Sequence, residues 1–211
     1  MSSRDVVLGR IRSALAQDGP AQPIPRDYIK YTDNAPGSEP VIELLTDRLV
    51  DYKALVRHVD AEGLASAIGE ALDGLQTVVI APGLPDVIGG PCAANGRRVV
   101  TDTAPSVLTP QDLDAVDAVV TTARVAIAMS GTIILDGGPG QGRRAISLVP
   151  DRHVIVLDAD QVVETVPEAV AMLEPTAPLT WIAGPSATSD IELERVEGVH
   201  GPRTLHVLIV R

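Results

Sequence analysis

The 211-residue sequence contains no phenylalanine, and its aromatic side chains are limited to one tryptophan and three tyrosines. Proteins that bind single-stranded nucleic acids stack the bases on aromatic rings, and this chain offers few such platforms. Basic residues are also scarce, because 17 lysines and arginines stand against 28 aspartates and glutamates, for a net charge of −11. An acidic chain repels phosphate backbones, so we exclude nucleic acid as a partner.

Cysteine occurs once, at Cys92, and no apolar run approaches 18 residues. A single thiol forms no internal disulfide and does not supply the four thiolates of a conventional iron–sulfur cluster. The four histidines show no metal-binding spacing, and without a long apolar run we expect no membrane-spanning helix. Residues 1–17 carry scattered charges and lack the apolar core of a secretory signal, so we expect a cytoplasmic protein.

Aliphatic residues are abundant, and the length fits one domain with an added segment. Residues 3–17 have apolar positions at helical spacing, and five prolines follow between residues 20 and 40. Proline disfavours helix and removes backbone donors, so the second stretch is predicted to be extended. We therefore divide the chain into an N-terminal helix with a proline-rich arm, residues 1–40, and a compact domain, residues 41–211.

The compact domain alternates short apolar segments with helical patterns. Residues 77–81 are apolar and β-branched, which is typical of a strand buried on both faces. The alternation predicts an α/β fold with a mostly parallel sheet, and the short connections between residues 118 and 157 predict an antiparallel part. Strands are predicted at residues 54–59, 77–81, 98–101, 118–121, 131–136, 154–157, 180–183 and 205–210, and helices at 41–52, 61–72 and 166–173, with another beginning after Thr109.

Two loop segments carry groups that bind anions. Ser130, Gly131 and Thr132 precede a predicted strand and could present N–H and O–H groups, although the same residues suit a tight turn. Arg143 and Arg144 end a glycine-rich loop, and guanidinium groups bind carboxylate or phosphate with paired hydrogen bonds. A hairpin tip with solvated arginines is the alternative. The loop matches neither a P-loop nor a dinucleotide-binding fingerprint.

Two later segments add hydroxyl groups and a histidine. Hydroxyls after a glycine turn could hold an anion at a helix start, or could simply cap that helix. His200, between glycine-flanked loops, could titrate near neutral pH and is a weak candidate for a catalytic acid or base, with a structural role as the alternative. The candidate ligand-binding residues in these segments are Gly184, Ser186, Thr188, Asp190, His200 and Gly201.

Taken together, residues 184–192, residues 198–202 and the following Leu205-His206-Val207 resemble the C-terminal part of the lactate-utilisation protein C family, the LUD-domain proteins. Residues 130–132, the Arg143/Arg144 loop with residues 147–150 and 153, and the N-terminal helix also resemble this family. The resemblance is dense from about residue 120 to the end and looser before it. The chain departs from the family at Met129, where many relatives carry an acid.

The resemblance implies a three-layer α/β/α fold like that of the formyltetrahydrofolate cyclo-ligase, CoA-transferase and ribose-phosphate isomerase group. It also implies a role in the oxidation of L-lactate to pyruvate, as one component of a three-protein system. The partners in such a system are iron–sulfur proteins, and this chain, with one cysteine, is expected to hold no cofactor of its own.

Three functions remain open from the sequence, and it does not decide whether the chain is an enzyme. The first is an accessory component of a lactate-oxidising system that binds a small anionic ligand. The second is a stand-alone enzyme acting on a phosphorylated or carboxylated small molecule, with Arg143 and Arg144 as the anion cradle and His200 as acid or base. The third is a purely structural interaction subunit that docks through residues 1–40. A homo-oligomer is compatible with each of them.

Overall fold

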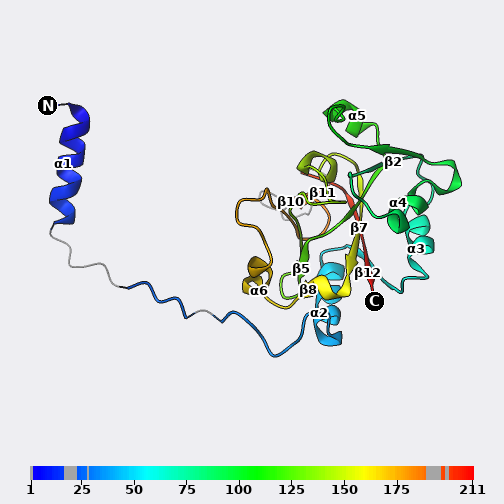
Figure 1. The fold of residues 1–211 in the computed structure, drawn as a ribbon, viewed down its shortest axis with the longest axis horizontal. Helices are drawn as coiled ribbons and strands as arrows, with labels where there is room; N and C mark the ends of the chain where they lie inside the picture. The colour runs from blue at the N-terminus through cyan, green and yellow to red at the C-terminus, as the bar shows by residue number, and fades with distance from the viewer. Residues whose placement is uncertain (1, 17–22, 28, 189–195, 198–199) are drawn as a thin grey trace.

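The structure is a computed structural model that describes residues 2–16, 23–27, 29–188, 196–197 and 200–211. Figure 1 shows a body built on β-sheets, with α1 standing apart from it. The helices are α1 (Ser3–Leu15), α2 (Glu39–Asp51), α3 (Leu64–Ala71), α4 (Asp86–Cys92), α5 (Pro110–Asp114) and α6 (Val166–Ala171). Short 3-10 turns occupy Ala94–Gly96, Arg144–Ser147 and Ala159–Gln161.

The main sheet has six strands, and every neighbouring pair is parallel. Its order is β1 (Leu55–Val59), β12 (Thr204–Val210), β7 (Arg152–Asp158), β4 (Ala118–Thr122), β2 (Thr77–Ile80) and β3 (Arg98–Thr101). The predicted parallel α/β sheet is therefore confirmed. In β2, Val78 packs into one core cluster and Val79 into another, which confirms that this strand is covered on both faces.

The antiparallel strands form a second sheet rather than part of the first. Its order is β8 (Val162–Val163), β5 (Val125–Ile127), β6 (Thr132–Leu135) and β9 (Thr180–Ile182), with β6 antiparallel to both β5 and β9. The sequence-based expectation of a single mixed sheet was wrong on this point. Only residues 128–131 separate β5 from β6, too few for the crossover of about a dozen residues that a parallel pair needs. A two-stranded piece, β10 (Ala187–Thr188) with β11 (Val196–Glu197), completes the strands.

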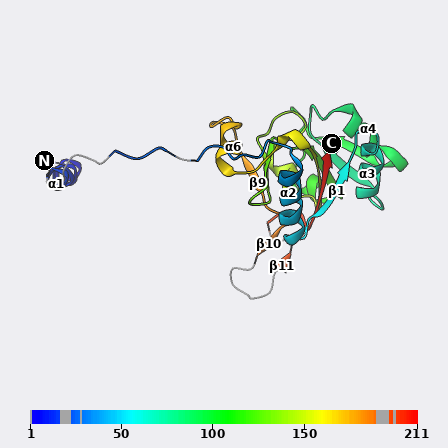
Figure 2. The ribbon, with the colours of Figure 1, turned by 90° about the horizontal axis from the view of Figure 1, so that it is seen from below.

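The layers follow from the two faces of the main sheet. Helices α3 and α4 cover one face, where Val78, Val120 and Val154 pack against Ile68. Helix α2 covers the other face through Leu45, and the second sheet packs into the same core cluster through Ile133. Figure 2 shows α2 lying beside β1. Helix α6 lies on the far side of the second sheet, as Figure 1 shows. The result is an α/β fold with helices on both sides of a parallel sheet.

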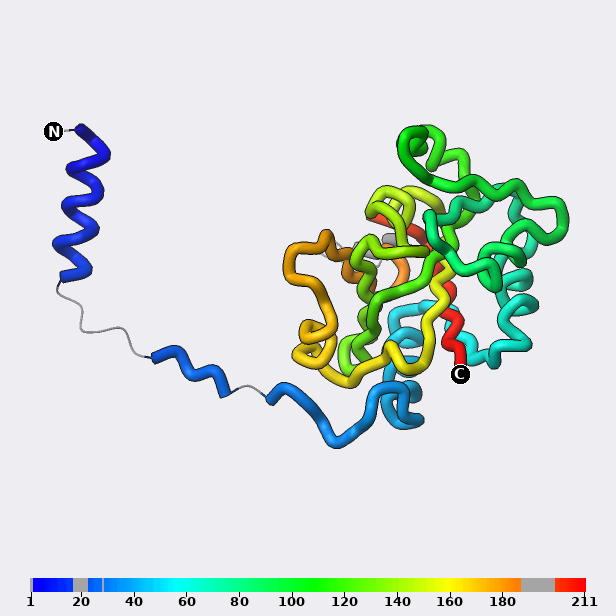
Figure 3. The backbone as a smooth tube through the Cα atoms, in the orientation of Figure 1, coloured from blue at the N-terminus to red at the C-terminus, as the bar shows by residue number. Residues whose placement is uncertain are grey.

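Among its described residues, the N-terminal segment hydrogen-bonds to the body near its end. Helix α1 begins with a capping box between Ser2 and Asp5 but has no buried residue. The arm, traced in Figure 3, reaches the body at Thr32, whose backbone N–H donates to Glu168 at 3.2 Å. The Gly37 N–H then donates to the Val162 carbonyl at 2.9 Å. Helix α2 begins at residue 39, slightly before the start predicted for this helix at residue 41. No helix in the described part of the chain is long and apolar enough to cross a membrane.

Candidate functional site

The loops after β2 and β3 begin at the carboxyl ends of parallel strands, where ligand sites are expected in such a sheet. The glycine-rich loop, residues 137–142, follows β6 and packs against the same ends of β2 and β4. The Gly140 N–H donates to the carbonyl of Pro82, after β2, at 2.9 Å, and the Thr122 N–H, at the end of β4, donates to Gly140 at 3.0 Å. At Gly142, φ is +69° and a Cβ atom would lie 2.6 Å from Ile146 Cδ1. Only glycine therefore allows this loop to pack so closely against the sheet.

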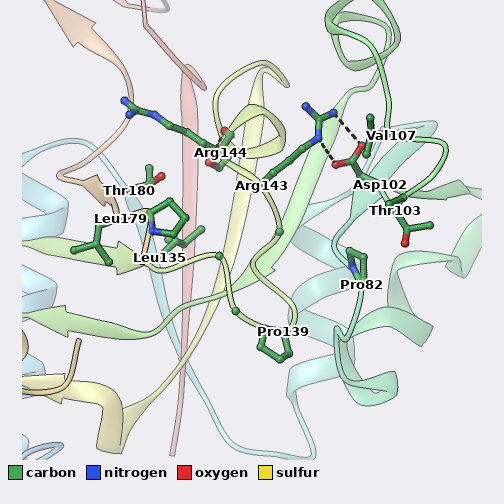
Figure 4. Close-up of a pocket in the computed structure, with 16 residues that line it drawn as sticks. Pro82, Asp102, Thr103, Val107, Leu135, Pro139, Arg143, Arg144, Leu179 and Thr180 are labelled. Atoms are coloured by element: carbon green, nitrogen blue, oxygen red, sulfur yellow. Dashed lines mark hydrogen bonds and ion pairs between the residues drawn. The ribbon is translucent and has the colours of Figure 1, made fainter. Parts of the chain in front are cut away.

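These loops enclose a first cavity of about 760 Å³. Figure 4 shows its lining residues, which come from the loops after β2 and β3, from the glycine-rich loop and from the start of β9. The lining residues include Pro82, Asp102, Thr103, Val107, Leu135, Gly142, Arg143, Arg144, Ser147, Leu179 and Thr180.

The structure separates the two arginines that the sequence suggested as a pair. Arg143 Nε lies 2.6 Å from Asp102 Oδ2, and Arg143 Nη2 lies 3.0 Å from Asp102 Oδ1. The guanidinium therefore donates two hydrogen bonds to one carboxylate. The Arg144 side chain extends in the opposite direction (Figure 4). It is exposed and forms no ion pair with any residue that the structure describes. Arg144 is thus the guanidinium left available to an anion.

Asp102 is buried, with its side chain 2% exposed. Burial alone would raise the pKa of this carboxyl, but hydrogen bonds from Arg143 and from the Leu108 backbone N–H outweigh burial and hold the pKa below its usual value. Asp102 in turn raises the pKa of Arg143. Both groups stay charged, and their contact ties the loop after β3 to the end of the glycine-rich loop.

A second cavity of about 480 Å³ lies on the other side of Arg144, which lines both cavities together with Ser147, Leu179 and Thr180. Four other predicted residues line this second cavity, namely Gly184, Ser186, His200 and Gly201. The His200 backbone N–H donates to Ser186 Oγ at 3.0 Å, and the Ser186 N–H donates to the Pro202 carbonyl at 2.8 Å. Two segments that are separate in the sequence therefore form one wall.

Among the described residues, the predicted segment 130–132 is not brought to either cavity. Ser130, Gly131 and Thr132 line neither, and the Ser130 hydroxyl donates to Thr132 Oγ1 at 2.8 Å. At Gly131, φ is +60° and a Cβ would lie 2.8 Å from Arg48 Cβ, so this turn packs on the end of α2. Thr188 belongs to β10, and Asp190, which was also predicted, lies outside the described residues.

Sequence reasoning missed a buried polar pair of which one member, His153, lines the second cavity. His153 on β7 lies 2.8 Å from Thr121 on β4, measured from Nε2 to Oγ1, and both side chains are buried. Burial lowers the pKa of His153 to about 3, so the imidazole is uncharged at neutral pH. The sequence feature that could have indicated this pair is the position of His153 directly before the strand predicted at residues 154–157. Asp102 was also missed, although it directly follows a predicted strand end.

Residues 84–210 match the LUD domain. Over 174 residues the chain is 47% identical to the "Lactate utilization protein C" of Deinococcus radiodurans, covering 81% of this chain and 79% of that protein. The chain belongs to the LUD domain family. The protein of the same name from Bacillus pumilus is 36% identical over 92 residues, 39% of this chain and 38% of the relative.

A solved structure supports the fold of this LUD domain protein. The crystal structure of a DUF162 family protein from Deinococcus radiodurans is 39% identical, with a TM-score of 0.67, and the match covers 82% of this chain and 97% of that one. The LUD domain contains every residue that the two cavities share, whereas β1 and β2 of the main sheet precede it.

The single thiol of this LUD domain protein lies in its core. Cys92 ends α4, is buried, and its Sγ donates to the Ile88 carbonyl at 3.2 Å. Burial raises the pKa of this thiol to about 11, so it is protonated and unreactive near neutral pH. Among the described residues, no group of three or more histidine, cysteine, aspartate or glutamate side chains is placed to hold a metal ion.

Proposed function

We propose that this chain is the component of an L-lactate oxidation system that carries no iron–sulfur cluster and works beside iron–sulfur proteins. The observation that carries the proposal is the 47% identity to a Lactate utilization protein C across 81% of the chain. Conversion of lactate to pyruvate releases two electrons and two protons, so the system needs an electron acceptor. One cysteine is fewer than a conventional all-cysteine cluster requires, and the proposal therefore assigns the clusters to partners.

We further propose that the second cavity binds a small carboxylate. Arg144 supports this assignment, because it has no carboxylate partner in the part of the chain that the structure describes and a guanidinium forms charge-assisted hydrogen bonds with an anion. Ser186 and His200 line the same cavity and add polar groups, while Leu179 and Pro202 supply apolar surface. A mostly apolar cavity with a few converging polar groups is typical of a small-molecule site.

The role in lactate use is tested with a strain in which the gene is deleted and no second lactate-oxidising system remains. We expect loss of growth on L-lactate, unchanged growth on pyruvate, and rescue by the wild-type gene. Normal growth of the deletion strain on L-lactate would refute the role. The assignment of clusters to partners is tested by co-purifying the chain with the products of neighbouring genes and measuring lactate oxidation with and without it.

The carboxylate site is tested in vitro with Arg144→Met. We expect carboxylates to raise the melting temperature of the wild-type protein, because a ligand of the native state stabilises it by mass action. The same ligands should leave Arg144→Met unshifted. If no carboxylate stabilises the wild type at saturating concentration, the binding part of the proposal fails while the lactate role stays open to the growth test.

A second candidate function is that of an interaction subunit docking through α1. The observation that favours it is the exposure of Val6, Val7, Ile11 and Leu15 on a helix with no buried residue. Removal of α1 should then abolish co-purification with the partners and leave the melting temperature unchanged. Retained assembly without α1 would exclude this docking mode.

A further inference from the structure

His153, which lines the second cavity, forms an uncharged hydrogen-bonding unit with Thr121 on the neighbouring strand. His153 on β7 is opposite Val119 on β4, so it reaches Thr121 two residues along that strand. The Nε2 to Oγ1 distance is 2.8 Å, and His153 is 1% exposed. Thr121 is fully buried and fixes the Nε2 edge of the imidazole through this hydrogen bond.

The other ring nitrogen of His153, Nδ1, forms no hydrogen bond with any residue that the structure describes. An imidazole nitrogen at a cavity wall that the protein leaves without a partner can hydrogen-bond a ligand. His153 lines the cavity together with Arg144 and Ser147. A ligand in this cavity therefore meets a charged group at Arg144 and an uncharged one at His153.

The chemistry of the pair defines what Nδ1 can bind. The Thr121 hydroxyl both donates and accepts, so it satisfies Nε2 in either neutral tautomer of His153. When the hydroxyl donates to Nε2, Nδ1 carries the proton and donates to a carbonyl or hydroxyl oxygen. When Nε2 donates to the hydroxyl, Nδ1 accepts from a hydroxyl group of the ligand. The same unit can therefore hold an alcohol or a ketone.

We propose that His153, held by Thr121, is the specificity-determining residue of the second cavity and hydrogen-bonds the hydroxyl or carbonyl group of a carboxylic acid whose carboxylate lies at Arg144. The inference rests on the proposed carboxylate site and adds the second group that the ligand must carry. A site built to hydrogen-bond a polar group discriminates against the analogue that lacks it, because its own polar atom is then left unpaired.

The test compares acids that differ by one oxygen function. L-Lactate and pyruvate are paired with propionate, and mandelate is paired with phenylacetate, because the cavity is larger than a three-carbon acid. Trp181, the single tryptophan, lines the cavity and reports binding by its fluorescence. We expect the wild type to bind each hydroxy or oxo acid at least about tenfold more tightly than its unsubstituted partner, the ratio that one hydrogen bond supplies.

Variants test whether this affinity ratio between paired acids depends on His153. His153→Phe keeps a ring of similar size without nitrogens, and we expect its ratio to fall to about one through weaker binding of the hydroxy and oxo acids alone. Thr121→Val leaves His153 without its support and should lower the ratio partway. The matched control is His58→Phe, because His58 makes the same 2.8 Å contact with Thr46 at the surface and lines neither cavity.

The outcomes separate this inference from the proposed function. Equal affinity for paired acids in the wild type, with binding that Arg144→Met abolishes, would overturn the inference and leave the carboxylate site standing. An unchanged ratio in folded His153→Phe would also overturn it. If that variant does not fold, Thr121→Val and the wild-type ratio decide. If no acid binds the wild type, the carboxylate site fails, and the inference fails with it.

Discussion

Arg143 and Asp102 lie 41 residues apart in the sequence and are joined by two hydrogen bonds, from Nε at 2.6 Å and from Nη2 at 3.0 Å. The contact uses the forked geometry that makes arginine suited to carboxylates, and here the carboxylate that Arg143 binds belongs to the same chain. Arg144, the next residue, points the other way and lines both cavities (Figure 4). Arg143 thus ties the loop after β3 to the glycine-rich loop, whereas Arg144 lines the two cavities.

The first prediction contrasts these two arginines. Arg143→Met leaves the buried Asp102 carboxylate without its cation, and we expect it to lower the free energy of unfolding at pH 7 by about 3 kcal/mol. Arg144→Met removes an exposed side chain that forms no ion pair with any described residue, and it should change stability by less than about 0.5 kcal/mol. Urea denaturation measures both values. Addition of Asp102→Asn to Arg143→Met should restore part of the loss, and equal losses in the two single variants would contradict the assignment.

The second prediction concerns stability against pH. The pKa of His153 is about 3 in the folded protein and near 6.5 when unfolded, so between these values only the unfolded state takes up the proton. The contribution of His153 is complete above pH 6.5 and is lost as the pH falls, by up to about 1.4 kcal/mol per pH unit.

Urea denaturation between pH 7.5 and pH 5 measures this slope, and His153→Phe should reduce it. His206, whose pKa is also lowered by burial, adds a slope of the same sign, so the difference between wild type and variant isolates His153. His58→Phe, at the surface, is the comparison. The same slope in wild type and His153→Phe would show that the imidazole is protonated in the folded state.

The third prediction separates backbone strain from crowding at two glycines. Gly142 and Gly74 both have positive φ, at +69° and +75°. A Cβ at Gly142 would lie 2.6 Å from Ile146 Cδ1 and 2.9 Å from Ala81 Cβ, whereas nothing lies within 4 Å at Gly74. We expect Gly74→Ala to cost about 1 kcal/mol from strain alone.

Gly142→Ala should cost about 1–3 kcal/mol more than Gly74→Ala, because the added methyl forces the glycine-rich loop off the sheet. Thermal unfolding compares the two variants. Equal melting temperatures would mean that the loop accommodates a side chain and is not held against Ala81.

The fourth prediction concerns the N-terminal segment. A chain starting at residue 23 lacks α1, which buries no residue, and should unfold with the same free energy within about 0.5 kcal/mol. A chain starting at residue 38 also loses the contacts of Thr32 with Glu168, of Asn34 with Glu164 and of Gly37 with Val162. We expect it to be about 1–3 kcal/mol less stable by urea denaturation. Equal stability of the two truncated chains would show that the docked part of the arm contributes nothing.

Helix α4 shows where local patterns were insufficient. It spans Asp86–Cys92 and contains Gly89, Gly90 and Pro91, which are poor helix formers, so no helix was predicted there. It forms because Ile88 and Cys92 are buried against α3 and the main sheet. Burial of two side chains outweighs an unfavourable local propensity, and that burial depends on residues distant in the sequence.

The sequence by itself determined the strands of the main sheet, the LUD-domain resemblance and some of the loop residues that line the cavities, among them Arg144, Ser186 and His200. Those features depend on local patterns of apolar residues, capping residues and glycines, which are properties of neighbouring positions. Only the tertiary structure decided that Arg143 is bound to Asp102 while Arg144 has no such partner among the described residues, and that residues 130–132 pack on α2 instead of lining a cavity. It also placed His153 against Thr121. The physical reason is that hydrogen bonds and ion pairs are short-range contacts, and which groups come within 3 Å is set by the register of strands far apart in the chain.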